Sequence, residues 1–157
     1  MKRKYVSTKF YREIGPVAYR QWRAESHCNL LHGYSLSIKV EFQSDKLDVR
    51  NWVVDYGSLR SFKDKLEEWF DHKLLVAYDD PNKEDFAELE KKKLAKITYL
   101  DRTGCEGIAV ALIEYLNDIW LVDNGYKNTD RKVYCTRVEV RETGANMAYV
   151  EQDYDQN

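Results

Sequence analysis

The chain has 157 residues and a formal net charge of −2, and hydrophobic and charged residues make up 43% and 33% of it. We therefore expect one globular domain over residues 1–157, with a core of ordinary size. The small net charge gives no electrostatic case for a nucleic-acid partner, and no apolar run approaches the roughly 18 residues of a membrane span. The three cysteines are widely spaced and odd in number, which favours a reducing cytoplasmic location over a disulfide framework.

The first half of the chain predicts two strands followed by a helix. Residues 8–22 mix aromatic and β-branched side chains, and we interpret them as a strand that bends or bulges at its Gly-Pro pair. Polar and apolar residues alternate over residues 32–42, which predicts a second strand with His32 on its apolar face. After a polar connection, Ser58 caps a predicted helix whose apolar residues recur at helical spacing to about residue 70.

The second half predicts an insert, a second helix and a hairpin. Residues 79–102 form the insert, with a turn, an exposed charged helix and a short strand. Apolar residues at helical spacing over 108–119 predict the helix, which opens near Thr103, and residues 132–142 and 147–152 alternate as paired strands. The order β-β-α-α-β-β predicts an α+β fold, an antiparallel sheet with two helices on one face.

Two imidazoles and a thiol lie within six residues of one another, at His27, Cys28 and His32. Taken alone, each residue most often has a structural role: a histidine as a buried, hydrogen-bonded imidazole and a cysteine as a small, unreactive core residue. Together, at the start of a strand, they favour a metal-assisted active site, because imidazole and thiolate are ligands that zinc prefers. The run lacks a clear third protein ligand.

Two other places carry groups for proton transfer or for binding a polar ring. Asp71 and His72 close the first predicted helix, where the pair can act as a proton donor or relay, the alternative being a solvated helix end. Glu142 extends the apolar face of a strand, where a carboxylate can accept the paired N–H groups of a guanidine-like ring edge, the alternative being simple exposure. Glu106 complements a helix dipole, and the remaining two cysteines are interpreted as packing residues.

Four segments, in this order, resemble the 6-pyruvoyl-tetrahydropterin synthase family, which includes the bacterial 6-carboxytetrahydropterin synthases of the queuosine pathway. They are Cys28-x-x-Leu31-His32-Gly33, the stretch Asn-Trp-Val-Val-Asp-Tyr-x-x-Leu at 51–59, Phe70-Asp71-His72-Lys73, and Val138-x-Val140-x-Glu142-Thr143. The resemblance implies the tunnelling fold (T-fold) and a homohexamer, a dimer of trimers, with active sites at subunit interfaces. It also implies a lyase that acts on 7,8-dihydroneopterin triphosphate, and the short spacing between Cys28 and His32 favours 6-carboxytetrahydropterin as the product.

The resemblance also implies roles for single residues. Cys28 would be the thiolate that acts as general base, and Asp71 with His72 would complete the proton relay. Glu142 would anchor the pterin ring, with Glu106 and Thr103 near a second recognition segment. Zinc is the implied cofactor, which polarises oxygens and acidifies bound hydroxyls.

The metal ligands depart from the family pattern, which holds zinc with three histidines. The family's His-Gly-His appears here as His32-Gly33-Tyr34, and its first-strand histidine falls at Tyr19. His27 and His32 remain as ligands, with Tyr34 or Tyr19 as a possible third, although a neutral tyrosine is a poor zinc ligand. Two alternatives follow: a non-catalytic pterin- or purine-binding protein of the same fold, and a lyase whose weaker metal site selects a different side-chain cleavage.

Overall fold

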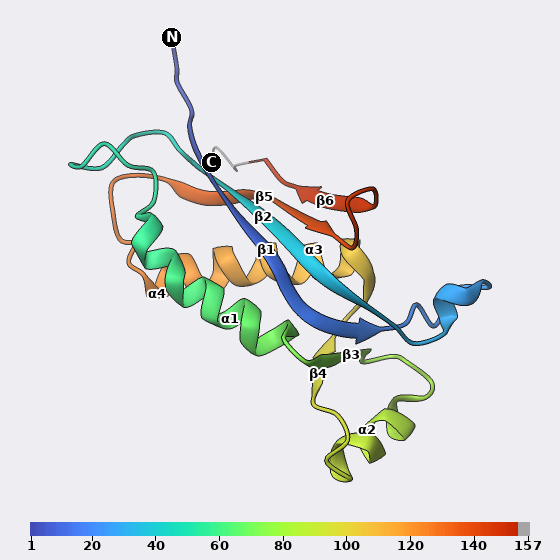
Figure 1. Cartoon of the computed structure of the whole chain (residues 1–157). Helices are drawn as coiled ribbons and strands as arrows, with labels where there is room; N and C mark the ends of the chain where they lie inside the picture. The colour runs from blue at the N-terminus through green and yellow to red at the C-terminus, as the bar shows by residue number, and fades with distance from the viewer. Residues whose placement is uncertain (154–157) are drawn as a thin grey trace.

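The computed structural model describes residues 1–153 and shows a single six-stranded sheet in the order β4-β3-β1-β2-β5-β6 (Figure 1). The strands are β1 Tyr5–Tyr19, β2 His32–Ser44, β3 Lys73–Ala77, β4 Ile97–Leu100, β5 Val133–Arg141 and β6 Met147–Glu151. The helices are α1 Arg60–Phe70, α2 Lys83–Lys91, α3 Gly104–Tyr115 and α4 Leu121–Asp123. Short 3-10 turns occur at His27–Asn29 and Tyr56–Leu59, and a π-helical turn, Leu116–Trp120, joins α3 to α4.

The predicted α+β class is confirmed, and two of the strand pairs are parallel, which the predicted antiparallel sheet did not include. β1 pairs antiparallel with β2, β2 with β5, and β5 with β6. β3 runs parallel to the last residues of β1, and β4 runs parallel to β3. Between β3 and β4 the segment containing α2 carries the chain back to the starting end of the sheet, as parallel neighbours require. The insert therefore adds an edge strand, β4, to the sheet.

β1 bends where its sequence contains the Gly-Pro pair. Its register against β2 shifts between Tyr11 and Ile14 and again between Ile14 and Val17. Gly15 has a φ of +129°, and a Cβ there would approach the backbone nitrogen of Val17 to 2.9 Å, so a side chain does not fit. The predicted bend is confirmed, and Figure 1 shows β1 curving at this point toward β3.

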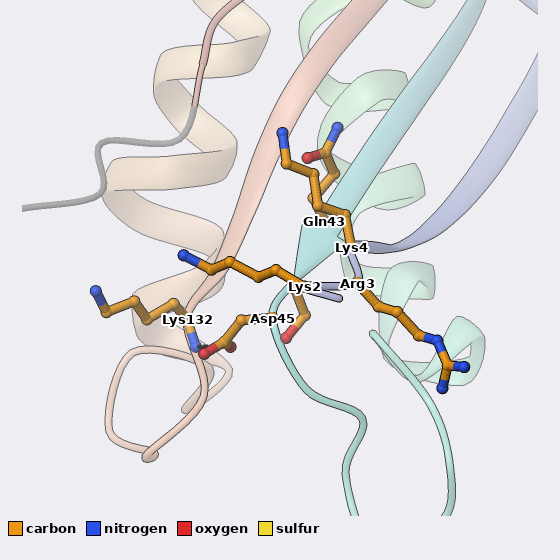
Figure 2. Close-up of a pocket in the computed structure, with 7 residues that line it drawn as sticks. Lys2, Arg3, Lys4, Gln43, Asp45 and Lys132 are labelled. Carbon is orange, nitrogen blue, oxygen red and sulfur yellow. Dashed lines mark hydrogen bonds between the residues drawn. The ribbon is translucent and has the colours of Figure 1, made fainter.

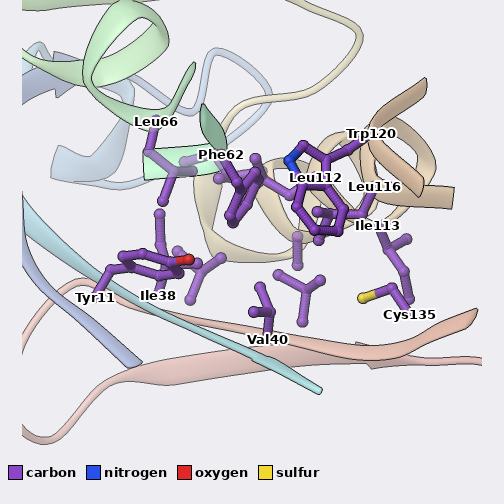
Figure 3. Close-up of a cluster of buried hydrophobic side chains, with 14 of the residues drawn as sticks. Tyr11, Ile38, Val40, Phe62, Leu66, Leu112, Ile113, Leu116, Trp120 and Cys135 are labelled. Carbon is purple, nitrogen blue, oxygen red and sulfur yellow. The ribbon is translucent and has the colours of Figure 1, made fainter. Parts of the chain in front are cut away.

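The core lies between the sheet and the helices α1 and α3. The alternating residues of β2 from Leu36 to Phe42 that face the helices are fully buried, as the period-two pattern predicts. They pack against a cluster supplied by β1, α1, α3 and the π-helical turn, part of which Figure 3 shows: Tyr11, Phe62, Leu66, Leu112, Ile113, Leu116 and Trp120. In residues 1–153 no helix has the length and apolar character needed to span a membrane.

Candidate active site

Three aromatic rings meet at one end of the β1–β2 pair. Tyr19, the last residue of β1, lies opposite His32, the first residue of β2, and Tyr34 follows two residues along β2 on the same face. The ring centroids are 5.6 Å apart for Tyr19 and His32, 5.7 Å for Tyr19 and Tyr34, and 5.2 Å for His32 and Tyr34. We call these three residues the ring triangle. The same two-residue alternation that buries Leu36 to Phe42 in the core therefore places His32 and Tyr34 on the same face of β2.

Glu142 reaches the ring triangle from the turn that follows β5. The hydroxyl of Tyr19 donates a hydrogen bond to Oε1 of Glu142 at 2.9 Å, across 123 positions of sequence. Because a carboxylate only accepts, the phenol keeps its proton in this bond. Burial, and then Glu142, raise the pKa of Tyr19, and the same causes raise the pKa of Tyr34. Both tyrosines are therefore neutral donors at ordinary pH.

Two thiols flank this cluster. Cys105, in the first turn of α3, is buried, and burial followed by the adjacent Glu142 carboxylate raises the pKa of its thiol to about 12. The sequence had suggested a packing role for this residue, and no local pattern links it to Glu142. Cys28 is half-buried in the turn before β2 and lies near Tyr34. Both thiols are free.

His32 has a defined tautomer in this arrangement. Its Nδ1 lies 2.6 Å from the carbonyl oxygen of Leu30. A carbonyl only accepts, so Nδ1 carries a proton, and in the neutral ring Nε2 keeps its lone pair. His32 thus offers one nitrogen as a base or ligand.

A buried ion pair holds the loop that carries His27 and Cys28. The guanidinium of Arg20 donates to the carboxylate of Asp80 from Nε at 3.0 Å and from Nη2 at 2.7 Å. Its Nη1 donates to the main-chain and side-chain oxygens of Asn29 at 3.3 and 3.2 Å. Burial opposes ionisation of Asp80, but the hydrogen bonds from Arg20 and from the backbone of Asn82 hold its pKa below the usual range. The sequence reading missed this pair, because no spacing rule connects positions 20 and 80.

Thr103 and Glu106 lie beside this loop at the start of α3. The hydroxyl of Thr103 donates to the carbonyl oxygen of Arg20 at 2.7 Å, and Thr103 is buried, whereas Glu106 is exposed. Both line a hollow that also includes Gln21 and Trp22. They are sequence neighbours of Cys105, but neither Cys105 nor any residue of the ring triangle lines this hollow.

Asp71 and His72 lie at a different place on the chain, where α1 ends and β3 begins. Asp71 Oδ1 and His72 Nδ1 are 2.7 Å apart, and 79% of the His72 side chain is exposed. The pair lines an open hollow between the end of α1 and residues 90–96, and no residue of the ring triangle lines it. The predicted carboxylate–imidazole pair is thus formed, but within the described residues no hydrogen bond or ring contact joins it to Cys28 or Glu142.

A further hollow lies at the opposite end of the β1–β2 pair (Figure 2). Its lining is mainly cationic, with Lys2, Arg3, Lys4 and Lys132 around Asp45. Asp45 accepts a hydrogen bond from the backbone nitrogen of Lys132 at 2.9 Å. None of the predicted site residues lines this hollow, so we do not assign it to the active site.

Comparison with known proteins places this α+β sheet among the pterin synthases. The family model described as 6-pyruvoyl tetrahydropterin synthase matches residues 15–153. The chain therefore belongs to the 6-pyruvoyl tetrahydropterin synthase family, and the prediction of a lyase of this family is confirmed.

Curated relatives are named for one product of this family. The 6-carboxy-5,6,7,8-tetrahydropterin synthase of Rickettsia typhi is 27% identical over 115 residues, which is 72% of this chain and 82% of that protein. The protein of the same name from Rickettsia conorii is 28% identical over 114 residues, 71% of this chain and 81% of that one.

Solved structures confirm the T-fold. An uncharacterized protein from Wolinella succinogenes has a TM-score of 0.79 at 22% identity, covering 96% of this chain and 99% of that one. A catalytic-residue mutant of Plasmodium vivax 6-pyruvoyltetrahydropterin synthase has a TM-score of 0.63 at 11% identity, with the same coverage. At these identities the likeness establishes the fold alone.

The family generally binds zinc, and the donor set of this chain does not fit a zinc site of three histidines. Among residues 1–153 no group of three His, Cys, Asp or Glu side chains is placed to hold a metal ion. His27 is exposed in its turn and makes no described contact with the ring of His32. The hydroxyl of Tyr19 donates a hydrogen bond to Glu142, so this residue keeps its proton and does not offer a phenolate. No catalytic step is therefore derived through a metal.

Proposed function

We propose that this protein is a lyase that converts 7,8-dihydroneopterin triphosphate to a 6-substituted tetrahydropterin, with 6-carboxytetrahydropterin as the favoured product. The observation that carries the proposal is the convergence of Glu142, Tyr34 and Cys28 at the end of the β1–β2 pair. A carboxylate that could accept ring N–H groups and a half-buried free thiol both lie near Tyr34, which supports the proposal. The Rickettsia relatives, named as 6-carboxy-5,6,7,8-tetrahydropterin synthases, support the choice of product and a place in queuosine or pterin biosynthesis.

In this proposal Glu142 binds the N–H edge of the pterin ring. Two N–H groups of the ring donate to the carboxylate, whose Oε1 also accepts from Tyr19. Thr103 and Glu106 form a second recognition segment at the hollow beside Gln21. The ring's side chain then points toward the turn that carries Cys28.

Cys28 is the proposed general base. Its thiolate removes a proton from the side-chain carbon next to the ring, the electron pair of that C–H bond passes into the adjacent C=N bond of the dihydropterin, and the ring nitrogen takes a proton from a nearby acid. Asp71 and His72 are the proposed relay, with the imidazolium held by the carboxylate at 2.7 Å. Because this pair lines a separate hollow, it serves Cys28 only when a second subunit brings its own pair to the site. The proposal thus includes a homohexamer of single-domain subunits.

The proposal also includes a cytoplasmic location, which three free cysteines support. Zinc, which the family generally binds, has only His27 and His32 as candidate histidine ligands at this end of the sheet, so the proposal does not depend on it. A second candidate function is a non-catalytic pterin- or purine-binding protein. The two tyrosines of the ring triangle favour it, since they replace imidazoles with weaker metal ligands.

Turnover of 7,8-dihydroneopterin triphosphate, followed by liquid chromatography and mass spectrometry, tests the proposal. We expect the unaltered protein to form a 6-substituted tetrahydropterin and Cys28→Ala to abolish turnover while still binding the substrate. Cys135→Ala, which removes a thiol from the core, is the matched control and keeps its turnover when folded. Glu142→Gln should weaken binding by about 2–5 kcal/mol, as for a desolvated charged contact. If Cys28→Ala still turns the substrate over, Cys28 is not the general base. If the unaltered protein binds the substrate tightly but forms no product, the result supports a non-catalytic binding protein.

A further inference from the structure

The ring triangle holds two phenols and one imidazole in a space where three imidazoles would converge on a metal. Tyr19 and His32 are direct cross-strand partners, and Tyr34 shares their face, so the three ring centroids lie between 5.2 and 5.7 Å apart. Tyr19 is the fully buried member, with 0% of its side chain exposed. Its hydroxyl is committed to Glu142 at 2.9 Å.

The donor groups in this space are not placed to hold zinc, since among residues 1–153 no three His, Cys, Asp or Glu side chains are arranged around a common metal position. A structural or catalytic zinc ion needs at least three deprotonated protein donors, and a phenol that donates to a carboxylate is not one of them. Oε1 of Glu142 accepts the hydrogen bond from Tyr19. Nδ1 of His32 donates a hydrogen bond to the carbonyl oxygen of Leu30, so only Nε2 of this ring remains as a ligand. Cys28 adds one thiol near Tyr34.

We propose that this site binds its ligand without a resident zinc ion, and that the hydrogen-bonded pair of Tyr19 and Glu142, with Tyr34 beside it, occupies the place of the metal. The neutral phenols then hold hydroxyl or carbonyl oxygens of the ligand's side chain by hydrogen bonds. They do not acidify those oxygens as a metal ion does, so removal of a proton from the ligand depends on side-chain bases such as Cys28. The pterin ligand in this inference rests on the proposed function, whereas the metal content does not.

Metal content and zinc titration test the inference directly. The unaltered protein, produced in zinc-supplemented medium and purified without chelator, is analysed by inductively coupled plasma mass spectrometry and titrated with zinc by calorimetry. We expect well under one zinc per chain and no saturable site at micromolar zinc. One zinc per chain that is lost on changing His32 to Ala would overturn the inference.

The double variant Tyr19→His with Tyr34→His completes the three imidazoles of the ring triangle. We expect it to acquire one zinc per chain with submicromolar affinity. The control variant Tyr5→His with Tyr149→His adds the same two imidazoles elsewhere on β1 and β6 and should stay metal-free. A double variant that is folded by circular dichroism and still binds no zinc shows that the ring triangle is not the metal position. Should that variant fail to fold, the titration of the unaltered protein decides alone.

Binding of 7,8-dihydroneopterin separates this inference from the proposed function. Tryptophan fluorescence of the unaltered protein is titrated with 7,8-dihydroneopterin in EDTA and again in added zinc. Equal affinity in the two buffers supports binding without metal. Binding only with zinc overturns the inference and leaves the proposed function standing. No binding in either buffer overturns the proposed function, while the metal content still decides the zinc question.

Discussion

Tyr11 and Tyr19 are both buried tyrosines on β1, and they differ in what their hydroxyls do. Tyr11 lies 5% exposed against Phe62 of α1, and its hydroxyl has no hydrogen-bond partner among residues 1–153. Tyr19 is 0% exposed, and its hydroxyl donates to Glu142. In the middle of β1, Tyr11 therefore contributes only apolar packing, whereas at the end of the strand Tyr19 also donates a hydrogen bond.

The difference comes from what covers the two parts of the β1–β2 pair. Helices α1 and α3 cover the middle with apolar side chains, which fill the space and leave no polar partner. At the end, the cover is the loop 20–31, the first turn of α3 and the turn after β5, which supply a thiol and a carboxylate. A candidate site arises where the apolar cover stops while the strand alternation continues.

The largest effect should come from the covered middle of the pair. Phe42→Ala removes a fully buried ring that lies 5.8 Å from the ring of Trp120, and should lower the free energy of unfolding by about 3–5 kcal/mol in urea denaturation. Phe10→Ala, on the exposed face of β1, is the control and should change it by less than about 1 kcal/mol. Equal losses would show that the two faces of the sheet are not packed differently.

A slightly smaller effect should follow from breaking the buried ion pair beside the site. Arg20→Met leaves the carboxylate of Asp80, 3% exposed, without its partner, and should cost about 3 kcal/mol in unfolding free energy. Arg23→Met removes an exposed pair with Asp79 and should cost about 0.5 kcal/mol or less. The double variant Arg20→Met with Asp80→Asn should recover part of the loss in a double-mutant cycle, and strict additivity would show that the pair is not coupled.

The two tyrosines give the sharpest matched test. Tyr19→Phe removes the hydroxyl that donates to Glu142 and should lower the unfolding free energy by about 2 kcal/mol, since hydrogen bonds to charged groups are worth about 1.5–3 kcal/mol. Tyr11→Phe removes a hydroxyl without a described partner and should leave stability unchanged or slightly raised. Thermal and urea unfolding of both variants measure this difference. A reversed order would contradict the assignment of the polar and apolar ends.

The smallest expected effect is a change in alkaline stability at Cys105. The folded pKa of this thiol is raised to about 12 from 9.0, so the neutral form is favoured in the fold. The protonated thiol therefore contributes to the free energy of unfolding. This contribution is complete at pH values below the pKa of the unfolded chain, and it is lost as the pH rises through the pKa of the folded protein. Between pH 8 and pH 10 this amounts to about 1.4 kcal/mol. In Cys105→Ala the unfolding free energy should therefore fall less over this range than in the unaltered protein, and identical slopes would contradict the shift.

Much of the fold was predictable because it depends on local burial. The alternation from His32 onward predicted β2 and its buried face, and helical spacing predicted α1 and α3. The ordered segments around Cys28, His72 and Glu142 predicted the family, which the match over residues 15–153 confirms. The parallel position of β3 beside β1 was not predicted, because strand order across a sheet leaves no trace in the period of a single strand.

The sequence by itself determined which residues carry chemistry: a thiol and imidazole at the start of β2, a carboxylate–imidazole pair after α1, and a carboxylate after β5. Only the tertiary structure decided how they group. It joined Tyr19 to Glu142 and Arg20 to Asp80, and it placed Asp71 with His72 in a separate hollow. The physical reason is that side-chain periodicity reports short-range burial, whereas contacts across 123 or 60 positions depend on strand order and on the bend of β1.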